Sequence, residues 1–190
     1  MSAAATGERI VDAFTRLVRD HWLDEITLDD VAREAGVTVQ TVIRRFGGKE
    51  GLHSASAERL GLQVRLNRET PVGKIGAGVT ALVRDYEVSG DVTVRLLAQE
   101  PRYGILKPLL DIGRQWHRQW LEALLEPFLD GLQSRERERR VAAAILVTDV
   151  YAWHLLRRDQ CRSLNETRAI MEESLRAVVH QGERKGQEDG

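Results

Sequence analysis

Apolar residues recur every three or four positions along most of the chain, which is the spacing of one face of an α-helix. Ile10, Phe14 and Leu17 follow this spacing and predict a first helix over about residues 7–23. No segment alternates apolar and polar residues as a half-buried strand would. The pattern predicts an all-α protein of about nine helices, the other eight over about residues 28–35, 39–45, 49–69, 73–87, 92–100, 105–128, 134–158 and 164–181.

Two threonines and a glycine mark the ends of the second and third helices. Thr27 and Thr38 precede these helices and can accept hydrogen bonds from N–H groups that the first turn of a helix leaves unpaired. Gly36 lies between the two helices, and glycine readily adopts the positive φ that often ends a helix. A tight turn is therefore predicted between them.

The lengths of the predicted helices divide the chain. Short helices occupy residues 1–50, and the helix over 49–69 connects them to a larger carboxy-terminal domain over 51–190. Within that larger domain, Ser89-Gly90 is predicted to separate two helices, because glycine weakens a helix interior. We therefore expect a small amino-terminal domain and a larger domain of longer helices.

The second and third helices have the proportions of a helix-turn-helix. Two helices that cross near a right angle need small residues where they meet, and Ala32 and Gly36 supply them. Val31, Val37 and Val42 would fill the space between the helices. The opposite side of the third helix would be open, and a two-turn helix with an open polar face fits the major groove of B-DNA. That side carries Val39, Gln40, Thr41, Ile43, Arg44 and Arg45.

Each of these polar side chains also has an explanation that does not involve DNA. Arg44 and Arg45 could be solvated charges that offset the helix dipole, as most charges at a helix end are. Gln40 and Thr41 could be ordinary helix surface, whereas in a DNA reader glutamine suits adenine and the threonine methyl group suits thymine. The residues alone leave both interpretations open.

The overall charge restricts how such a protein could bind nucleic acid. The 190 residues carry a formal net charge of -1 at pH 7, so any positive surface must be local. Residues 1–50 hold seven Lys or Arg against nine Asp or Glu, and no basic arm precedes the first helix. Groove contacts from an amino-terminal extension are therefore not expected.

No segment has the pattern of a membrane or secretion signal. The first residues lack the apolar stretch of a signal peptide, and no run of about 18 apolar residues occurs. The single cysteine, Cys161, allows no disulfide within the chain. We expect a cytoplasmic protein without a membrane partner.

The residue types that usually carry catalysis or bind metals have no convincing arrangement. The five histidines lack metal-ligand spacing, and Cys161 has no obvious base beside it in the sequence. No glycine-rich phosphate loop follows a strand, because no strand is predicted. We expect no enzyme activity, no metal site and no cofactor.

Aromatic residues gather in the larger domain. Trp116 and Trp120 are four positions apart and lie on one helix face with Ile112. They could be ordinary core, or they could line an apolar cavity for a small effector together with a few polar side chains. The candidate ligand-binding residues are Tyr86, Arg95, Trp116, His117, Trp120 and Trp153.

A single small helix-turn-helix binds DNA weakly, so a homodimer is expected. Two copies spaced about one turn of DNA apart, roughly 34 Å, would add their binding energies on a near-palindromic operator. Segments 141–156 and 164–179 carry apolar stripes that could pair with a second copy or pack inside one subunit. The candidate interface residues are Ala144, Ile145, Thr148, Ala152, Leu155, Met171, Leu175 and Val178.

Residues 10–52 resemble the TetR family of bacterial transcriptional regulators. The resemblance rests on a first helix followed by TLDDVAREAGVTVQTVIRRFGGKEGL, in which the caps, the turn and the phenylalanine–glycine–lysine–glutamate run occur in register. It implies a turn at residues 36–38, contacts of residues 38–41 with bases or backbone, and a phosphate beside Lys49, although Lys49 could instead pair with a carboxylate. The DNA-binding candidates are Thr27, Thr38, Val39, Gln40, Thr41, Ile43, Arg44, Arg45 and Lys49.

The resemblance also implies a function for the whole chain. Such proteins are ligand-responsive regulators, most often repressors, whose last helices pair with a second copy as a four-helix bundle. Their effector favours a conformer in which the recognition helices no longer match successive grooves. One departure concerns Ile43: the family often has a phosphate-binding tyrosine there, and isoleucine cannot donate a hydrogen bond. Arg44 or Arg45 is expected to take over that contact.

Two other functions fit the sequence. The chain could be a helical protein-interaction adaptor that binds neither DNA nor small molecules. It could also bind DNA without a small effector, with partner proteins setting its output. A gel-shift experiment separates the adaptor from the two regulators.

Overall fold

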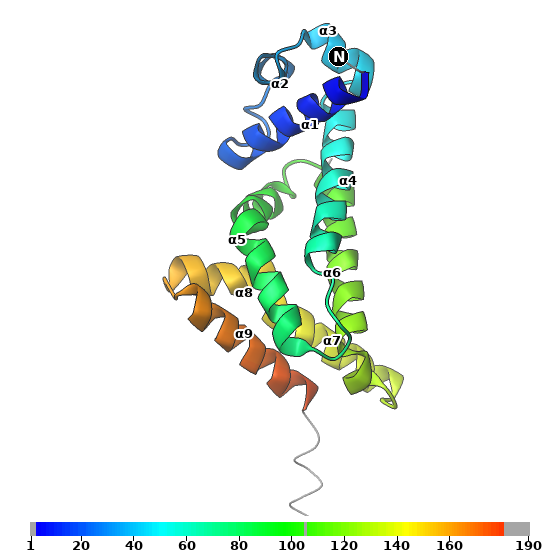
Figure 1. The fold of residues 1–190 in the computed structure, drawn as a ribbon, viewed down its shortest axis with the longest axis vertical. Coiled ribbons are helices and arrows are strands. Elements are labelled where there is room, and N and C mark those ends of the chain that lie inside the picture. Colours follow the sequence, from blue (N-terminus) through cyan, green and yellow to red (C-terminus); the bar gives the residue numbers. More distant parts are fainter. Residues whose placement is uncertain (1–2, 105, 181–190) are drawn as a thin grey trace, which may run out of the picture. The chain divides into compact units, whose positions relative to one another are not determined.

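The structure confirms the all-α prediction. The computed structural model describes residues 3–104 and 106–180, which form helices α1 to α9 and one turn of π-helix, η1. Figure 1 shows these helices, with no strand in the part of the chain that is described. Their bounds are α1 (Ala3–Asp20), α2 (Leu28–Ala35), α3 (Val39–Phe46), α4 (Lys49–Asn67), α5 (Ile75–Gln99), α6 (Leu106–Leu129), α7 (Ser134–Thr148), α8 (Val150–His154), η1 (Leu155–Asp159) and α9 (Leu164–Val179).

The chain divides into two compact units. The first unit holds the residues up to Gln63 together with the segment Ala98–Leu109. The second unit holds Val64–Leu97 and the residues from Leu110 onward. The segment Ala98–Leu109 therefore belongs with the amino-terminal helices although it lies far along the sequence. The domain boundaries drawn from the sequence, 1–50 and 51–190, stay a prediction.

The first unit is built around the short helices α2 and α3. α1 packs on α2, and α2 packs on α3. The interior receives buried side chains from all four amino-terminal helices, including Ile10 and Phe14 of α1, Val31 of α2, Val42 of α3 and Leu52 of α4. This small apolar interior fixes α3 through one side and leaves its other side open.

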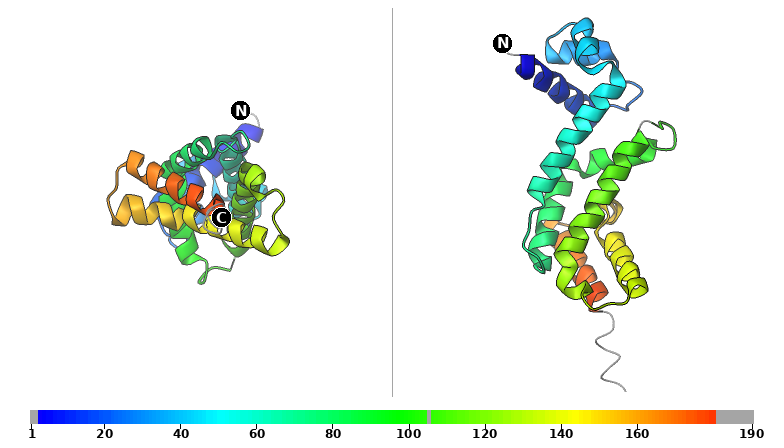
Figure 2. Two further views of the ribbon diagram at one scale, coloured as in Figure 1. Left: turned by 90° about the horizontal axis from the view of Figure 1, so that it is seen from below. Right: turned by 90° about the vertical axis from the view of Figure 1, so that its right-hand side faces the viewer.

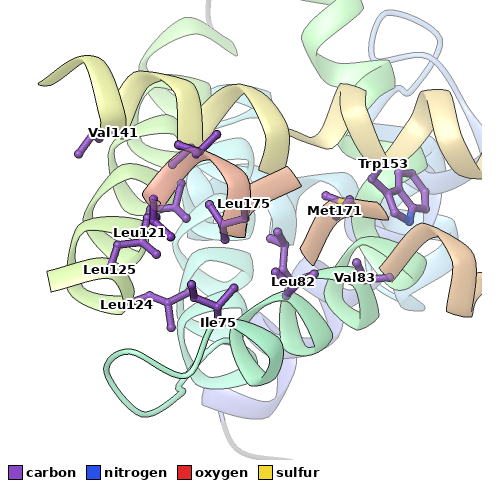
Figure 3. Packing of buried hydrophobic residues seen from close by; sticks show 14 of the residues in the cluster. Ile75, Leu82, Val83, Leu121, Leu124, Leu125, Val141, Trp153, Met171 and Leu175 are labelled. Carbon is purple, nitrogen blue, oxygen red and sulfur yellow. The ribbon is translucent and has the colours of Figure 1, made fainter. Parts of the chain in front are cut away.

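The second unit has a larger apolar core, to which each of its long helices contributes. Figure 3 shows Leu121, Leu124 and Leu125 of α6 close to Ile75 of α5 and Leu175 of α9. Trp153 of α8 is buried in the same core. Burial of large apolar side chains is the dominant favourable contribution to the stability of this unit.

The predicted break at Ser89-Gly90 is wrong, because α5 runs without interruption from Ile75 to Gln99. Gly90 lies against the indole ring of Trp153, and a Cβ atom at this position would collide with the ring. Ser89 is accommodated by donating its hydroxyl proton to the Asp85 carbonyl at 2.9 Å, one turn earlier. The glycine therefore makes room for an aromatic side chain and does not end a helix.

The single helix predicted over residues 134–158 is also wrong. α7 ends at Thr148, and Asp149 has an extended backbone with φ −63° and ψ 153°. The Asp149 carboxylate accepts the Tyr151 N–H at 2.9 Å and so caps the new helix α8. Aspartate is a favoured capping residue, which explains why the chain restarts a helix here. Figure 2 shows α9 running beside α7.

Candidate nucleic-acid interface

Thr27 begins α2 and keeps its hydroxyl occupied with Asp30. The Thr27 hydroxyl donates to the Asp30 carboxylate at 2.6 Å and accepts the Asp30 N–H at 3.1 Å. The Thr27 N–H donates to the same carboxylate at 3.0 Å, which completes a capping box. These hydrogen bonds from Thr27, with the charge of Arg33, lower the pKa of Asp30. Thr27 is exposed, and its observed role is to fix the start of α2.

The turn between α2 and α3 has the predicted geometry. Gly36 adopts the left-handed conformation with φ 62° and ψ 44°, and the Val37 N–H donates to the Ala32 carbonyl at 2.9 Å. Thr38 is extended and its hydroxyl accepts the Thr41 N–H at 3.3 Å, so it caps α3. The Thr38 and Thr41 hydroxyls also share a hydrogen bond of 2.9 Å. The hydroxyls are therefore partly committed to the cap.

α3 presents an open face to solvent. Val42 is fully buried, whereas Gln40, Ile43 and Arg44 are exposed. Residues three and four apart lie on one side of a helix, so these three side chains share a face. Val39 and Thr41 are half-buried beside it. One side of this eight-residue helix is therefore open to solvent, and it carries both polar and apolar side chains.

The two adjacent arginines differ in their surroundings. The guanidinium of Arg45 lies against α1, with Nη1 3.0 Å from the point where a Cβ of Gly7 would be. Arg44 is one position earlier on α3 and therefore points about 100° away around the helix. Of the two arginines, Arg44 shares the outward face with Gln40 and Ile43, while Arg45 also packs against the unit's own first helix.

Lys49 opens α4 and contacts the loop between α1 and α2. Its Nζ donates a hydrogen bond to the Leu23 carbonyl, and the phosphate contact expected for it stays a prediction. Partial burial lowers the pKa of Lys49, and the negative charge of Asp24 opposes this shift. An ammonium group has three donors, so two remain for another acceptor.

Three glycines shape the connection from α3 to α4. Gly47 and Gly48 have φ 74° and 137°, which side chains with a Cβ rarely adopt. Gly51 has no such φ, but a Cβ atom there would collide with the Phe46 carbonyl oxygen. The close approach of α4 to the end of α3 therefore depends on Gly51, which the sequence-based interpretation missed because nothing in a helical pattern marks a contact with the preceding helix.

The segment Ala98–Leu109 holds the α1–α2 loop. The buried amide of Gln99 accepts the Leu23 N–H at 3.0 Å. Arg102 lies 3.7 Å from the Asp24 carboxylate, and a hydrogen bond from Tyr103 lowers the pKa of Asp24. None of these residues was predicted to contribute to the amino-terminal unit, because a contact between positions 23 and 99 leaves no local sequence signal.

His53 lies inside the first unit. Its ring meets that of Phe14 edge-on, with centroids 4.7 Å apart, and its Nε2 has no hydrogen-bond partner. Burial, together with the nearby positive charge of Lys49, lowers the pKa of His53 to about 4. The imidazole is therefore neutral at pH 7 and behaves as part of the apolar interior.

The second unit contains a buried ion pair surrounded by aromatic rings. Arg68 donates from Nη2 and Nε to the Asp85 carboxylate at 2.6 and 2.9 Å, and the side chains of the two residues are only 8% and 4% exposed.

His117 connects this pair to Thr148. Arg68 Nη1 lies 3.2 Å from His117 Nδ1, and His117 Nε2 lies 3.1 Å from the Thr148 hydroxyl. Burial and the Arg68 charge lower the pKa of His117 to about 3. Neutral His117 thus accepts from Arg68 and donates to Thr148, whose own proton goes to the Ala144 carbonyl.

The predicted ligand-binding residues divide between this network and its surroundings. Tyr86 donates to the Thr148 carbonyl at 3.1 Å, and Trp120 donates to the Arg68 carbonyl at 2.8 Å. Burial raises the pKa of Tyr86 to about 12, so its hydroxyl keeps its proton. The remaining candidates have other neighbours: Trp153 contacts Tyr86 and hydrogen-bonds Glu87, Trp116 lies under Arg65, and Arg95 is a half-buried residue of α5. Arg68 and Asp85, which hold the network together, were not predicted.

Most of the predicted dimer residues are buried inside their own unit. Ala144, Thr148, Met171 and Leu175 are almost fully buried, and Val178 is buried as well. Ile145 and Ala152 are half-buried, and Leu155 is exposed. The same helices also expose Leu146, Tyr151 and Ile170, which were not predicted.

Among the described helices, none is both long and apolar enough to cross a bilayer. Residues 10–55 match the family described as bacterial regulatory proteins, tetR family. The chain is also 39% identical over 59 residues to the HTH-type transcriptional regulator AlkX of Mycobacterium tuberculosis. That match covers 31% of this chain and 28% of the relative.

Solved structures are similar over nearly the whole chain. A tetR-family transcriptional regulator from Streptomyces coelicolor superposes with a TM-score of 0.74 at 18% identity, over 98% of this chain and 87% of its own. A transcriptional regulator from Rhodococcus sp. Rha1 superposes with a TM-score of 0.71 at 15% identity, over 91% and 95%. At such low identity, the likeness establishes a shared fold.

Proposed function

We propose that the chain, whose residues 10–55 match the tetR family of bacterial regulatory proteins, is a ligand-responsive repressor of transcription. It binds a near-palindromic operator as a homodimer and is released by a small apolar or aromatic effector. The family consists of DNA-binding regulators and not of enzymes. The observation that carries this proposal is the open face of α3, which a capped helix and a left-handed glycine hold outward.

DNA binding is assigned to α3 and its caps. An eight-residue helix fits the major groove, where the Gln40 amide suits adenine and Arg44 suits guanine or a phosphate. Arg45 and Lys49 already have contacts within the unit, so we expect them mainly to position the helix. Any contact of theirs with DNA should be with a backbone phosphate. Arg44 is therefore the stronger candidate for the contact that a tyrosine makes elsewhere in the family.

The homodimer is assigned to the accessible apolar surface of α7, α8, η1 and α9. Leu146, Tyr151, Leu155 and Ile170 are large apolar side chains exposed on these helices, and Ile145 and Ala152 are partly accessible beside them. A second copy would cover this surface and bring two α3 helices onto one operator. Leu146→Glu should convert the dimer to a monomer in analytical ultracentrifugation, whereas the exposed Leu62→Glu in α4 should not.

The effector site is assigned to the aromatic residues around Arg68. Tyr86, His117 and Trp120 surround its guanidinium with aromatic surface and a few polar groups. A ligand that binds a second conformer several kcal/mol more tightly would shift the population away from the DNA-binding form. Tryptophan fluorescence during titration with a panel of small aromatic compounds would identify such a ligand, and a Trp116→Ala variant that keeps the full response would remove that residue from the site.

A gel-shift experiment tests the central proposal. A duplex from the region upstream of the chain's own gene should form a saturable complex at moderate salt, and random duplex should compete poorly. Arg44→Ala should weaken this complex and reduce the salt dependence of its affinity, with a smaller effect from Arg45→Ala. Equal affinity for the upstream and random duplexes would instead favour the adaptor.

A further inference from the structure

Ile43 is an apolar side chain on the otherwise polar outward face of α3. It is 40% exposed, whereas Val42 on the other side of the helix is fully buried. Isoleucine is β-branched and a weaker helix former than leucine, alanine or most charged residues, so this position gains nothing in helix stability from it. About two-fifths of its surface is accessible to an apolar group outside the chain.

Its neighbours identify the kind of partner. Gln40 and Arg44 flank Ile43 on the same exposed face, and both suit groups in the major groove of DNA. The Thr38 and Thr41 hydroxyls are hydrogen-bonded to each other and are therefore partly committed to the cap. The one apolar group that base pairs present in the major groove is the 5-methyl group of thymine.

We infer that Ile43 packs against the 5-methyl group of a thymine in each operator half-site and selects thymine at that position. This inference rests on the proposed DNA-binding function and names one specificity determinant within it. Removing one buried methyl group weakens binding about fourfold, so loss of the contact in both half-sites should weaken it about fifteenfold.

Replacing thymine by deoxyuridine removes the methyl group and leaves base pairing intact. Duplexes that bind the full-length protein would first be selected from a random pool, and each thymine of the resulting consensus would then be replaced in turn. One symmetric pair of replacements should weaken binding of the wild-type protein about fifteenfold. Replacements outside the half-sites, made in the same duplex, serve as the control.

Two variants show which side chain contacts the methyl group. In Ile43→Ala, whose new residue favours helix, the deoxyuridine effect should fall below about twofold. In Thr41→Ser, which removes a neighbouring methyl group but keeps the hydroxyl that bonds Thr38, the full effect should remain. Circular dichroism of both variants checks that the helices form.

The outcomes separate this inference from the function on which it rests. Failure to enrich any duplex would overturn both. Enrichment of a consensus without thymine, or a deoxyuridine effect that persists in Ile43→Ala or disappears in Thr41→Ser, would overturn the role of Ile43 alone.

Discussion

The two units of the molecule place their polar side chains differently. In the first unit the caps of α2 and α3 bond within three residues, as Thr27 does with Asp30 and Thr38 with Thr41. In the second unit they bond across the fold, as Arg68 does with Asp85 and His117 with Thr148. Short-range caps keep a small helix rigid while its outer face stays open, which suits a surface that contacts DNA.

The long-range network has a different consequence. A buried guanidinium is costly unless its charge and its donors are matched, so each member of the network depends on the others. The network brings together residues of α5, α6 and α7 with Arg68, which follows the last residue of α4. A ligand that disturbed it would act on several helices at once.

Removing the carboxylate of Asp85 should have the largest effect on stability. Asp85→Ala leaves the Arg68 guanidinium buried without its counter-charge, which typically costs about 3–5 kcal/mol. The free energy of unfolding, measured by urea titration, checks this. The exposed pair of Arg114 and Asp111 provides the control, since Asp111→Ala should cost less than about 1 kcal/mol. Equal effects of the two variants would show that the buried ion pair contributes no more to the free energy of unfolding than the exposed pair.

In the first unit, the largest expected effect comes from a glycine. Gly51→Ala places a Cβ atom against the Phe46 carbonyl oxygen, so α3 and α4 must separate at a cost of about 2–3 kcal/mol. DNA affinity should fall with stability, because α3 loses its position. Gly113→Ala is the matched control: nothing lies near its Cβ position, and alanine in α6 should stabilise the protein by about 0.5–1 kcal/mol. Two substitutions of equal size would thus act in opposite directions.

Acidification should destabilise both units through their buried histidines. The pKa values of His53 and His117 are about 4 and about 3 in the folded protein, below the value of about 6.5 for an unfolded chain. Between these values the unfolded chain takes up protons that the folded protein does not. The two neutral imidazoles make their full contribution to the free energy of unfolding above about pH 6.5. This contribution declines as the pH falls towards the pKa values of the folded protein. At pH 5 the loss is about 2 kcal/mol for each imidazole.

Urea titrations between pH 7 and pH 5 measure this loss. His53→Leu should remove the part of this pH-dependent loss of stability that comes from His53, since leucine suits the same apolar surroundings and cannot take up a proton. A pH dependence as steep in His53→Leu as in the wild-type protein would show that His53 is not buried in its neutral form.

The same contrast explains what could be predicted from the sequence. The helices α2 and α3, their caps at Thr27 and Thr38 and the turn at Gly36 depend on residues close together in the chain, and the structure confirms them. Gly90 was misinterpreted because its partner, Trp153, is more than sixty positions away. Arg68, Asp85 and Gln99 were missed for the same reason, since a buried polar side chain is recognisable only when the helices that surround it are in place.

The smallest predicted effect concerns the contact between Gln99 and the α1–α2 loop. Gln99→Ala leaves the buried Leu23 N–H without an acceptor, which should cost about 1–2 kcal/mol and speed its hydrogen exchange. The adjacent Tyr103→Phe removes a hydrogen bond to Asp24 at the protein surface, so exchange at Leu23 should change less. Amide exchange followed residue by residue distinguishes the two variants.

Gln99 ends α5, and the Leu23 carbonyl also accepts a hydrogen bond from Lys49 at the start of α4. Faster exchange in Gln99→Ala together with weaker DNA binding would therefore show that Gln99 stabilises the α1–α2 loop on which Lys49 depends. Unchanged exchange at Leu23 in Gln99→Ala would instead mean that the α1–α2 loop keeps its structure without the hydrogen bond to Gln99.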